Sequence, residues 1–309
     1  MTAPSRIGIV ILAYNSDADL PSCLRGLLAQ KGIDSKIIVV DNASKPDSLA
    51  LMENAFLAQV PTGKIFEVGS VDSTKLECGA GIFIRNSQNA GYSAGNNIGA
   101  RLAAKIGCDA VLIVNPDVRV SNPRYIEILW NSMREDPSCA VAASRILGLS
   151  DAEENPIREL GFWEELLWIR RFGPSVLRPK STVQPFTGTE PVEANKLNGC
   201  CFLIRSSFLE ATNYLDENVF LYSEEPILAA RVRAAGKRMM FFPQVEAMHI
   251  HIKSAKGNVS NRVRQSIKSR LYYIDRYSGY GLLARIALHF SYGVLSLLHA
   301  AKIRLFNHG

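Results

Sequence analysis

Residues 89–117 of this 309-residue chain read NAGYSAGNNIGARLAAKIGCDAVLIVNPD, and this stretch decides the fold class. It opens on a turn rich in glycine and asparagine, continues into a helical pattern, and ends in the continuous apolar run 110–114. Such a run is typical of a strand covered on both faces, as in a parallel sheet. Asp117 follows the run closely, at the position where open α/β sheets bind ligands. We therefore expect a helix and then a buried strand with an acidic residue at its carboxyl end.

The rest of the chain repeats this alternation of apolar strands and helical patterns. The alternation predicts an α/β fold of the Rossmann-like kind, with a mainly parallel sheet flanked by helices. Residues 61–81 are expected to be irregular or to form a hairpin, and residues 150–193, which lack a clear period, could form a mobile loop over the site. The expected strands are 7–14, 36–40, 82–85, 110–114, 139–143, 200–204 and 239–242, the last ending at Pro243, and the expected helices are 17–30, 48–59, 94–106, 123–134 and 224–235.

Charge is distributed unevenly along the chain. The net charge is +6, yet residues 253–309 hold ten Lys and Arg and one acid, a net +9, which leaves −3 for residues 1–252. A basic tail on an acidic body suggests an anionic partner, such as a membrane surface or a polyphosphate. The tail has no recognised nucleic-acid-binding motif, so we expect no nucleic acid partner.

Composition and cysteine spacing indicate a cytoplasmic protein. The chain is 47% hydrophobic and 21% charged, as globular proteins are, and its N-terminus lacks the apolar segment of a signal peptide. The six cysteines form no C-x-x-C pair and no zinc spacing, so we expect them to be reduced and mostly buried. The expected location is the cytoplasm, with the tail as a peripheral contact to the inner membrane.

The tail is expected to form two helices and to be separate from a first domain of residues 1–255. Residues 261–277 are basic and helical, and residues 283–301 place apolar side chains on one helix face and polar side chains on another. Only 16 residues separate Arg285 from Lys302, fewer than the roughly 20 that a spanning helix needs. The second helix could lie in a membrane interface, pack on the protein's own core, or pair with a second subunit in a homodimer. The tail, residues 256–309, therefore has three alternative roles.

Polar side chains follow three of the expected parallel strands. They are Asn15, the pair Asp41-Asn42, and Asn115 with Asp117. Because the carboxyl ends of parallel strands meet at one edge of a sheet, these side chains are expected to lie together. Each residue alone could simply cap the helix that follows it. Together with the glycine-rich turn they predict a ligand site, although the chain has neither a G-x-G-x-x-G fingerprint nor a Walker A sequence.

The motifs, in their order, resemble the GT-A glycosyltransferases of family 2, most closely the bacterial rhamnosyltransferase-like branch. The resemblance implies a nucleotide-diphosphate sugar donor, with dTDP-rhamnose as the leading candidate, a divalent metal (Mg²⁺ or Mn²⁺), inversion at the anomeric carbon, and a bacterial surface-glycan acceptor, free or lipid-linked. It covers residues 5–255 and rests on Asp41-Asn42-Ala43-Ser44, Asn89-x-Gly91-Tyr92-x-x-Gly95-Asn96-Asn97, Asn115-Pro116-Asp117, Asn198-Gly199-x-x-Phe202, Leu215-Asp216-Glu217, Glu224-Glu225, Arg231, Gly236, and His249 and His251 with Ser254.

The resemblance also implies roles for individual residues. Asp117 would ligate the metal, and His249 or His251 would complete its shell, since imidazole suits such metals; a structural role is the alternative for each histidine. Asn115 replaces the first acid of the family's Asp-x-Asp motif, so the diphosphate and water would supply further ligands. Nucleotide-sugar binding would fall to Asn15, Asp41, Asn42, Asn89, Gly91, Asn96, Asn97, Asn115, Asp117 and Arg231.

The pair Glu224-Glu225 matches the family's Glu-Asp motif at the start of a helix. Inverting transfer needs a base for the acceptor hydroxyl, and the resemblance gives this role to Glu225. Acids in a first helical turn also favour the helix dipole, which is the purely structural alternative. The usual run is Glu-Asp-Val-Asp-Leu, whereas this chain continues with Pro226 and Ile227. The departure leaves a catalytically weak nucleotide-sugar-binding or assembly subunit as the alternative function.

Overall fold

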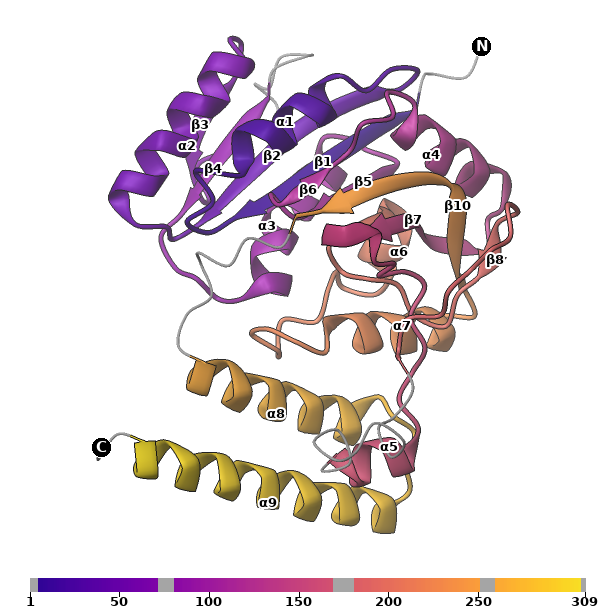
Figure 1. Ribbon diagram of the computed structural model, residues 1–309. Helices are drawn as coiled ribbons and strands as arrows, with labels where there is room; N and C mark the ends of the chain where they lie inside the picture. The colour runs from indigo at the N-terminus through magenta and orange to yellow at the C-terminus, as the bar shows by residue number, and fades with distance from the viewer. Residues whose placement is uncertain (1–4, 72–80, 169–180, 251–258, 307–309) are drawn as a thin grey trace.

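A computed structural model describes residues 5–71, 81–168, 181–250 and 259–306 of the chain. Its core is a ten-stranded sheet in the order β3-β4-β2-β1-β5-β9-β7-β10-β6, with β8 paired to β10 (Figure 1). The strands are β1 Arg6–Ala13, β2 Asp34–Asn42, β3 Lys64–Glu67, β4 Ile82–Asn86, β5 Ala110–Val114, β6 Val118–Arg119, β7 Cys139–Leu147, β8 Val192–Glu193, β9 Cys201–Arg205 and β10 Arg238–His249. The helices are α1 Leu20–Leu28, α2 Pro46–Gln59, α3 Tyr92–Lys105, α4 Tyr125–Glu135, α5 Phe162–Leu166, α6 Ser206–Ala211, α7 Glu224–Ala234, α8 Val259–Arg276 and α9 Leu282–Phe306, with the 3₁₀ turn η2 Leu149–Asp151.

The N-terminal half of the sheet is parallel, as the apolar runs predict. Strands β3, β4, β2, β1 and β5 all pair in parallel, and β9 then pairs antiparallel with both β5 and β7. Every residue of β5 is buried, because helices cover both faces of the sheet. The predicted α/β class with a mainly parallel sheet is therefore confirmed.

Alternate strand residues feed two separate hydrophobic cores. Ile9 and Ile11 of β1 belong to the core that includes residues of α1, α2 and α4, whereas Val10 belongs to the core that includes residues of α3, α6 and α7. Figure 1 shows these two sets of helices on opposite sides of the sheet. A Cβ on Gly99 of α3 would lie 2.6 Å from Val10 Cγ1, so glycine lets this helix approach β1 closely. The helix glycines thus serve packing against the sheet.

Two expectations about strands are wrong. Residues 61–81 contain β3, which pairs in parallel with β4 at the sheet edge. Its four residues carry little apolar pattern, since the strand is only partly buried. The last strand does not end at Pro243 but continues to His249 as β10, because an irregularity in register between Phe242 and Glu246 accommodates the proline. The continuation matters because it carries His249 to the candidate site.

The segment 150–193 contains more order than its sequence pattern suggests. It holds η2, α5 and β8, and isolated bridges join Ile157 to Val183 and Lys196. Residues 169–180 of this segment lie outside the described residues, and a lid function for the segment stays a prediction. Five cysteines are buried and free, as expected, and Cys78 lies outside the described residues.

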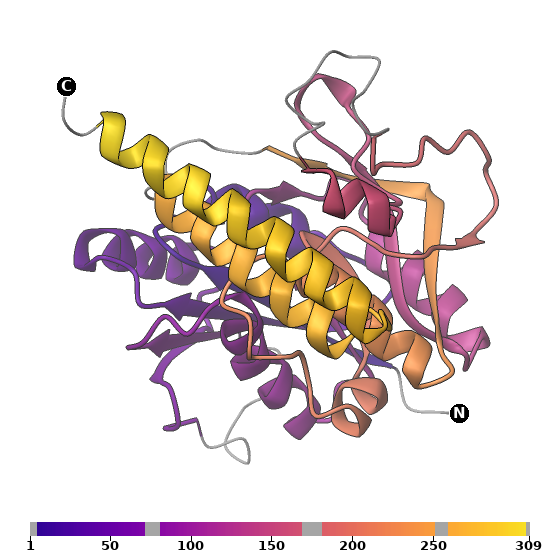
Figure 2. The ribbon, with the colours of Figure 1, turned by 90° about the horizontal axis from the view of Figure 1, so that it is seen from below.

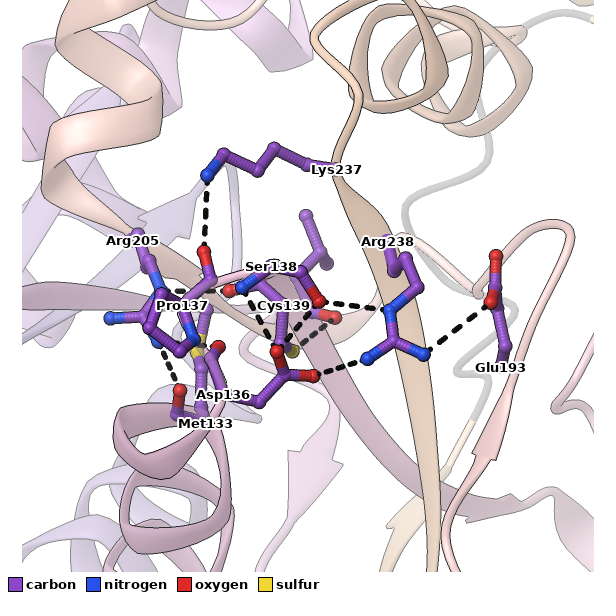
Figure 3. A network of polar contacts seen from close by, with 10 residues as sticks. Met133, Asp136, Pro137, Ser138, Cys139, Glu193, Arg205, Lys237 and Arg238 are labelled. Carbon is purple, nitrogen blue, oxygen red and sulfur yellow. Dashed lines mark hydrogen bonds and ion pairs between the residues drawn. The ribbon is translucent and has the colours of Figure 1, made fainter.

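A cluster of polar side chains lies at the N-terminal ends of β7 and β10 (Figure 3). The Arg205 guanidinium donates to the carbonyl oxygens of Cys139 at 2.7 Å and Asp136 at 2.9 Å. Arg238 pairs with the Asp136 carboxylate at 2.7 Å, and Lys237 donates to the Pro137 carbonyl at 3.1 Å. These contacts connect the turn between α4 and β7 to β9 and β10. They lie at the opposite end of the strands from the carboxyl ends of β5 and β10. The cluster therefore stabilises the fold away from the candidate site.

The C-terminal helices α8 and α9 lie side by side beneath the sheet region (Figures 1 and 2). A third hydrophobic core joins these two helices to the rest of the protein. Its buried residues outside α8 and α9 are Val219 and Ile227. Ile227 stands where the family motif has its second Asp, so the apolar substitution anchors the helix pair. The expected domain boundary at residues 255 and 256 falls outside the described residues.

Candidate active site

The carboxyl ends of β1, β2 and β5 lie together, as predicted. Ala13 of β1 is in register with Asp41, and Ile11 with Val114. Asn15 has a positive φ of 49° and ties the loop after β1 to the loop after β2, since its N–H donates to Ser44 Oγ at 2.8 Å. The capping alternative does not hold for the first two helices, because Asp19 and Lys45 occupy their N-cap positions.

Asp41 is buried at the end of β2, beside a cavity of about 380 Å³. Its carboxylate accepts the Ser44 backbone N–H at 3.3 Å. Burial raises the pKa of Asp41, and the hydrogen bonds from Ser44 oppose that rise. Arg85, which also lines the cavity, forms ion pairs with Glu53 and Glu67. The cavity is thus lined by both acidic and basic side chains. It lies next to the end of β2, where the sequence analysis predicts nucleotide binding.

Asn42, Asn89 and Gly91 form a connected turn. The Asn42 amide donates to Asn89 Oδ1 at 3.0 Å and to the Gly91 carbonyl at 3.3 Å. Gly91 has φ +104°, and a Cβ there would lie 2.3 Å from the Phe220 carbonyl oxygen. The three residues therefore fix the loop before α3 against the segment before α7. Direct contact of these residues with a nucleotide stays a prediction.

Asn96 and Asn97 are both fully buried in α3. Asn97 donates to the Leu215 carbonyl at 2.9 Å and to Glu217 at 2.7 Å, and it accepts the Leu215 N–H at 2.9 Å. Asn96 donates to the Tyr92 carbonyl at 3.0 Å, while its Oδ1 has no partner among the described residues. The Asn97 amide thus holds the 215–217 segment in place, and a role of either residue in nucleotide binding stays a prediction.

Asp117 and His249 meet beyond the end of β5. Asp117 Oδ2 lies 3.4 Å from His249 Nε2, and Glu154 Oε2 lies 2.8 Å from His249 Nδ1. Burial lowers the pKa of His249, but the hydrogen bonds with Asp117, Cys200 and Glu154 outweigh it and raise the pKa to about 12. Asn115 holds this turn by donating its backbone N–H to the Cys200 carbonyl at 2.8 Å. His251 lies outside the described residues.

Asp117 and His249 are also the candidate metal ligands. Within the parts of the chain that the structure describes, no group of three or more His, Cys, Asp or Glu is arranged to hold a metal ion. The pair Asp117 and His249 nevertheless offers a carboxylate and an imidazole 3.4 Å apart, and Glu154 orients the imidazole from behind. That arrangement matches the carboxylate–histidine pattern common at metal sites. A cation here would take its remaining ligands from a diphosphate and water, and His249 would have to release the proton that it shares with Asp117 in order to bind the cation.

Glu224 and Glu225 begin α7, as expected, beside a cavity lined also by Tyr92 and Arg231. Burial, and then the charge of Glu225, raise the pKa of Glu224 to about 8. Glu224 Oε1 has no hydrogen-bond partner among the described residues. Arg231 donates to the Thr212 carbonyl. Burial and the neighbouring charge therefore favour the protonated form of Glu224, and the role of Glu225 as the base stays a prediction.

The backbone before α7 is strained. Tyr222 and Ser223 both adopt positive φ values, 71° and 65°, which non-glycine residues rarely do. This turn leads into α7, whose Glu225 lies beside Gly199, since a Cβ on Gly199 would be 3.3 Å from Glu225 Oε1. Cys200, the next residue, is one of the groups that raise the pKa of His249. The two halves of the candidate site, at Glu225 and at His249, are thus separated by two consecutive residues.

Two further residues lie at the candidate site, and the sequence analysis assigns neither of them a role. Glu154 contacts His249 from 95 residues away, within a segment without periodicity. Tyr92 donates its hydroxyl to the Gly199 carbonyl, and burial raises its pKa well above the usual value. Tyr92 lies inside a motif and is identifiable as a neighbour of Asn89 and Gly91, whereas no local signal marks Glu154.

The family model described as Glycosyl transferase family 2 matches residues 8–189, more than half of the chain. The chain belongs to glycosyl transferase family 2. Its match to the low-salt glycan biosynthesis hexosyltransferase Agl10 of Haloferax volcanii is 23% identical over 246 residues, 79% of this chain and 66% of Agl10. Its match to the N-acetylglucosaminyl-diphospho-decaprenol L-rhamnosyltransferase of Mycobacterium tuberculosis is 24% identical over 186 residues, 56% of this chain and 57% of that enzyme. The chain thus spans less than two thirds of the length of these relatives.

Solved structures of other glycosyltransferases share the fold. GalNAc-T7 with UDP, GalNAc and Mn²⁺ matches with a TM-score of 0.63 at 14% identity, covering 89% of this chain and 48% of that one. The mannosyltransferase PcManGT of Pyrobaculum calidifontis, in complex with GDP-Man and Mn²⁺, matches with a TM-score of 0.56 at 13% identity, covering 100% and 76%. The predicted GT-A fold of this family 2 member is therefore confirmed.

Proposed function

We propose that this family member is an inverting glycosyltransferase that uses a nucleotide-diphosphate sugar. The observation that carries the proposal is the placement of Glu225 and His249 on either side of the adjoining residues Gly199 and Cys200. A base and a candidate metal ligand would thus approach the donor from two elements, α7 and β10. Transfer with inversion needs these two functions on opposite sides of the anomeric carbon.

In the proposed reaction, the acceptor hydroxyl oxygen attacks the anomeric carbon while Glu225 takes its proton. The bond from that carbon to the diphosphate oxygen breaks, and the nucleoside diphosphate leaves with the bonding electron pair. Asp117 and His249 would hold a divalent cation, which neutralises charge on the leaving diphosphate. Glu154 fixes the His249 ring, and the buried, protonated Glu224 places a neutral neighbour beside the base.

For the donor and acceptor we propose rhamnose from dTDP-rhamnose and a bacterial surface glycan, either free or carried on a lipid diphosphate. The support is the resemblance in motif order and the rhamnosyltransferase among the relatives. A second relative is described as a hexosyltransferase of glycan biosynthesis, so a different hexose is the main competing donor. The nucleotide would lie over the cavity at Asp41, beside the ends of β1 and β2.

The first test measures donor binding and slow donor hydrolysis across a panel of nucleotide sugars, with and without Mn²⁺ or Mg²⁺. We expect one donor to bind in a metal-dependent way, and Asp117→Ala to abolish that dependence. Glu225→Gln is expected to bind the donor normally and to lose transfer. The matched variant Glu224→Gln is expected to keep transfer, because glutamine resembles the protonated acid.

The same experiment separates the alternative function. A protein that binds the donor but shows no hydrolysis or transfer with any acceptor is a nucleotide-sugar-binding or assembly subunit. Failure to bind any nucleotide sugar contradicts the nucleotide site at Asp41 and Asp117.

A further inference from the structure

Helix α9 differs from an ordinary surface helix because it leaves a large apolar face exposed. Its outward side chains are large and apolar: Leu283 is 82% exposed, Phe290 75% and Leu297 72%. Its buried positions include Leu288, Ser291 and Tyr292, which face the protein. Helices of soluble proteins normally turn their apolar stripe toward the core. An apolar stripe that faces outward therefore indicates a surface that binds a partner outside the chain.

The outward stripe is continuous. Spacings of three and four residues from Leu283 to Ala301 place its members on one side of the helix, over a length of about 27 Å. In Figures 1 and 2, α9 forms the outermost layer of the molecule, with α8 between it and the sheet region. The exposed large apolar members of the stripe are Leu282, Leu283, Ile286, Phe290, Val294, Leu297 and Leu298.

The inward face of α9 is fixed to the protein by polar contacts. Ser291 Oγ donates to the Leu166 carbonyl at 2.7 Å, and Tyr292 donates to Glu165 at 3.3 Å. Glu165 is buried and also pairs with Arg270 of α8. The sequence expectation that this helix is too short to span a membrane is wrong by length and composition: among the described residues, Leu282–Ala301 has the length and hydropathy to span a bilayer, and only 11% of its apolar 18-residue window is buried. A spanning orientation would break these contacts and leave Glu165 without its α9 partner, Tyr292.

We propose that α9 lies in the plane of an anionic lipid surface, with its outward stripe inserted among the lipid chains. The charge argues for lipid over a second copy of this chain. Residues 253–309 carry a net +9, so two copies joined through α9 would bring two strongly basic tails together. Arg264, Lys268 and Arg276 of α8 are exposed, and packed helices lie about 8–10 Å apart. These charges are therefore within roughly one Debye length of a surface that α9 contacts.

This inference does not depend on the proposed sugar transfer, and it can be tested without any donor. The purified full chain is mixed with sucrose-loaded vesicles of phosphatidylcholine alone, or with about 30% phosphatidylglycerol, at low and high salt. We expect binding to the anionic vesicles only, weakened by salt. The double variant Phe290→Glu with Leu297→Glu is expected to lower the partition coefficient at least about 100-fold, since each buried apolar side chain contributes tenfold or more.

A matched control places the same charges on another exposed apolar surface. Leu51 and Leu57 of α2 are exposed, and Leu51→Glu with Leu57→Glu is expected to keep vesicle binding. Both double variants are expected to unfold at the wild-type temperature, because the replaced side chains lie outside the core.

Three outcomes overturn the proposal. Equal binding to neutral vesicles contradicts the anionic preference, and binding that resists alkaline carbonate indicates a spanning helix. A wild-type dimer by light scattering that ignores vesicles, and that the α9 variant converts to monomer, assigns the stripe to a second copy instead.

Discussion

Replacing Glu224 with Gln tests the electrostatics of the candidate active site. Glu224 begins α7, and burial together with the charge of Glu225 raises its pKa from the ordinary 4.5 to about 8. A folded-state pKa above the unfolded value means that protonated Glu224 contributes stability below pH 4.5, and that this contribution is lost as pH rises through 8. Wild-type protein should therefore lose stability relative to Glu224→Gln across this window.

The size of the effect follows from the two pKa values. The difference between 4.5 and about 8 corresponds to a relative change of up to about 5 kcal/mol in the free energy of unfolding. Glutamine has no such titration, so the variant removes the whole pH-dependent contribution. Glu225→Gln removes the neighbouring negative charge but leaves Glu224 buried. This variant should therefore reduce the pH dependence of stability only in part.

The assay is urea unfolding of wild type and variants at pH 5, 6, 7 and 8, with the difference in unfolding free energy plotted against pH. Glu210→Gln, at an exposed position on α6, serves as the control and should leave the difference flat. A wild-type minus Glu224→Gln difference that stays constant from pH 5 to 8 would refute the assignment of a protonated, buried Glu224.

Three further predictions concern packing and the metal site. Asn97→Ala should destabilise the fold by about 2–4 kcal/mol in chemical unfolding, because it leaves the buried N–H and C=O of Leu215 unpaired; a change below the measurement error would contradict the buried network. Gly99→Ala should cost about 1–3 kcal/mol through overpacking against Val10, and a second substitution, Val10→Ala, should recover part of the loss; purely additive losses would contradict the close contact. Glu154→Ala should weaken Mn²⁺-dependent donor binding by about 10- to 100-fold by freeing its histidine partner, with metal-independent binding unchanged; equal losses with and without metal would assign Glu154 a structural role only.

Much of the sheet and its polar edge follows from local sequence. The run 110–114 is apolar throughout because both faces of β5 are covered, and this pattern is visible without a structure. Parallel pairing then brings Asp41 and the β5 end together, as the alternation of elements predicts. The strand β3 escaped prediction because a short, half-exposed edge strand needs no apolar pattern.

By itself, the sequence determined the fold class, the family and the order of its motifs, because hydrophobic periodicity and short motifs are local properties of the chain. Only the tertiary structure decided which partners those residues have. It placed Glu154 behind His249, since a contact across 95 residues leaves no periodic signal. It enclosed Asn97 in hydrogen bonds with a segment more than a hundred residues away. It also turned the apolar face of α9 outward, because the amphipathic pattern is the same whichever face meets the protein, and only packing against α8 and α5 distinguishes the two.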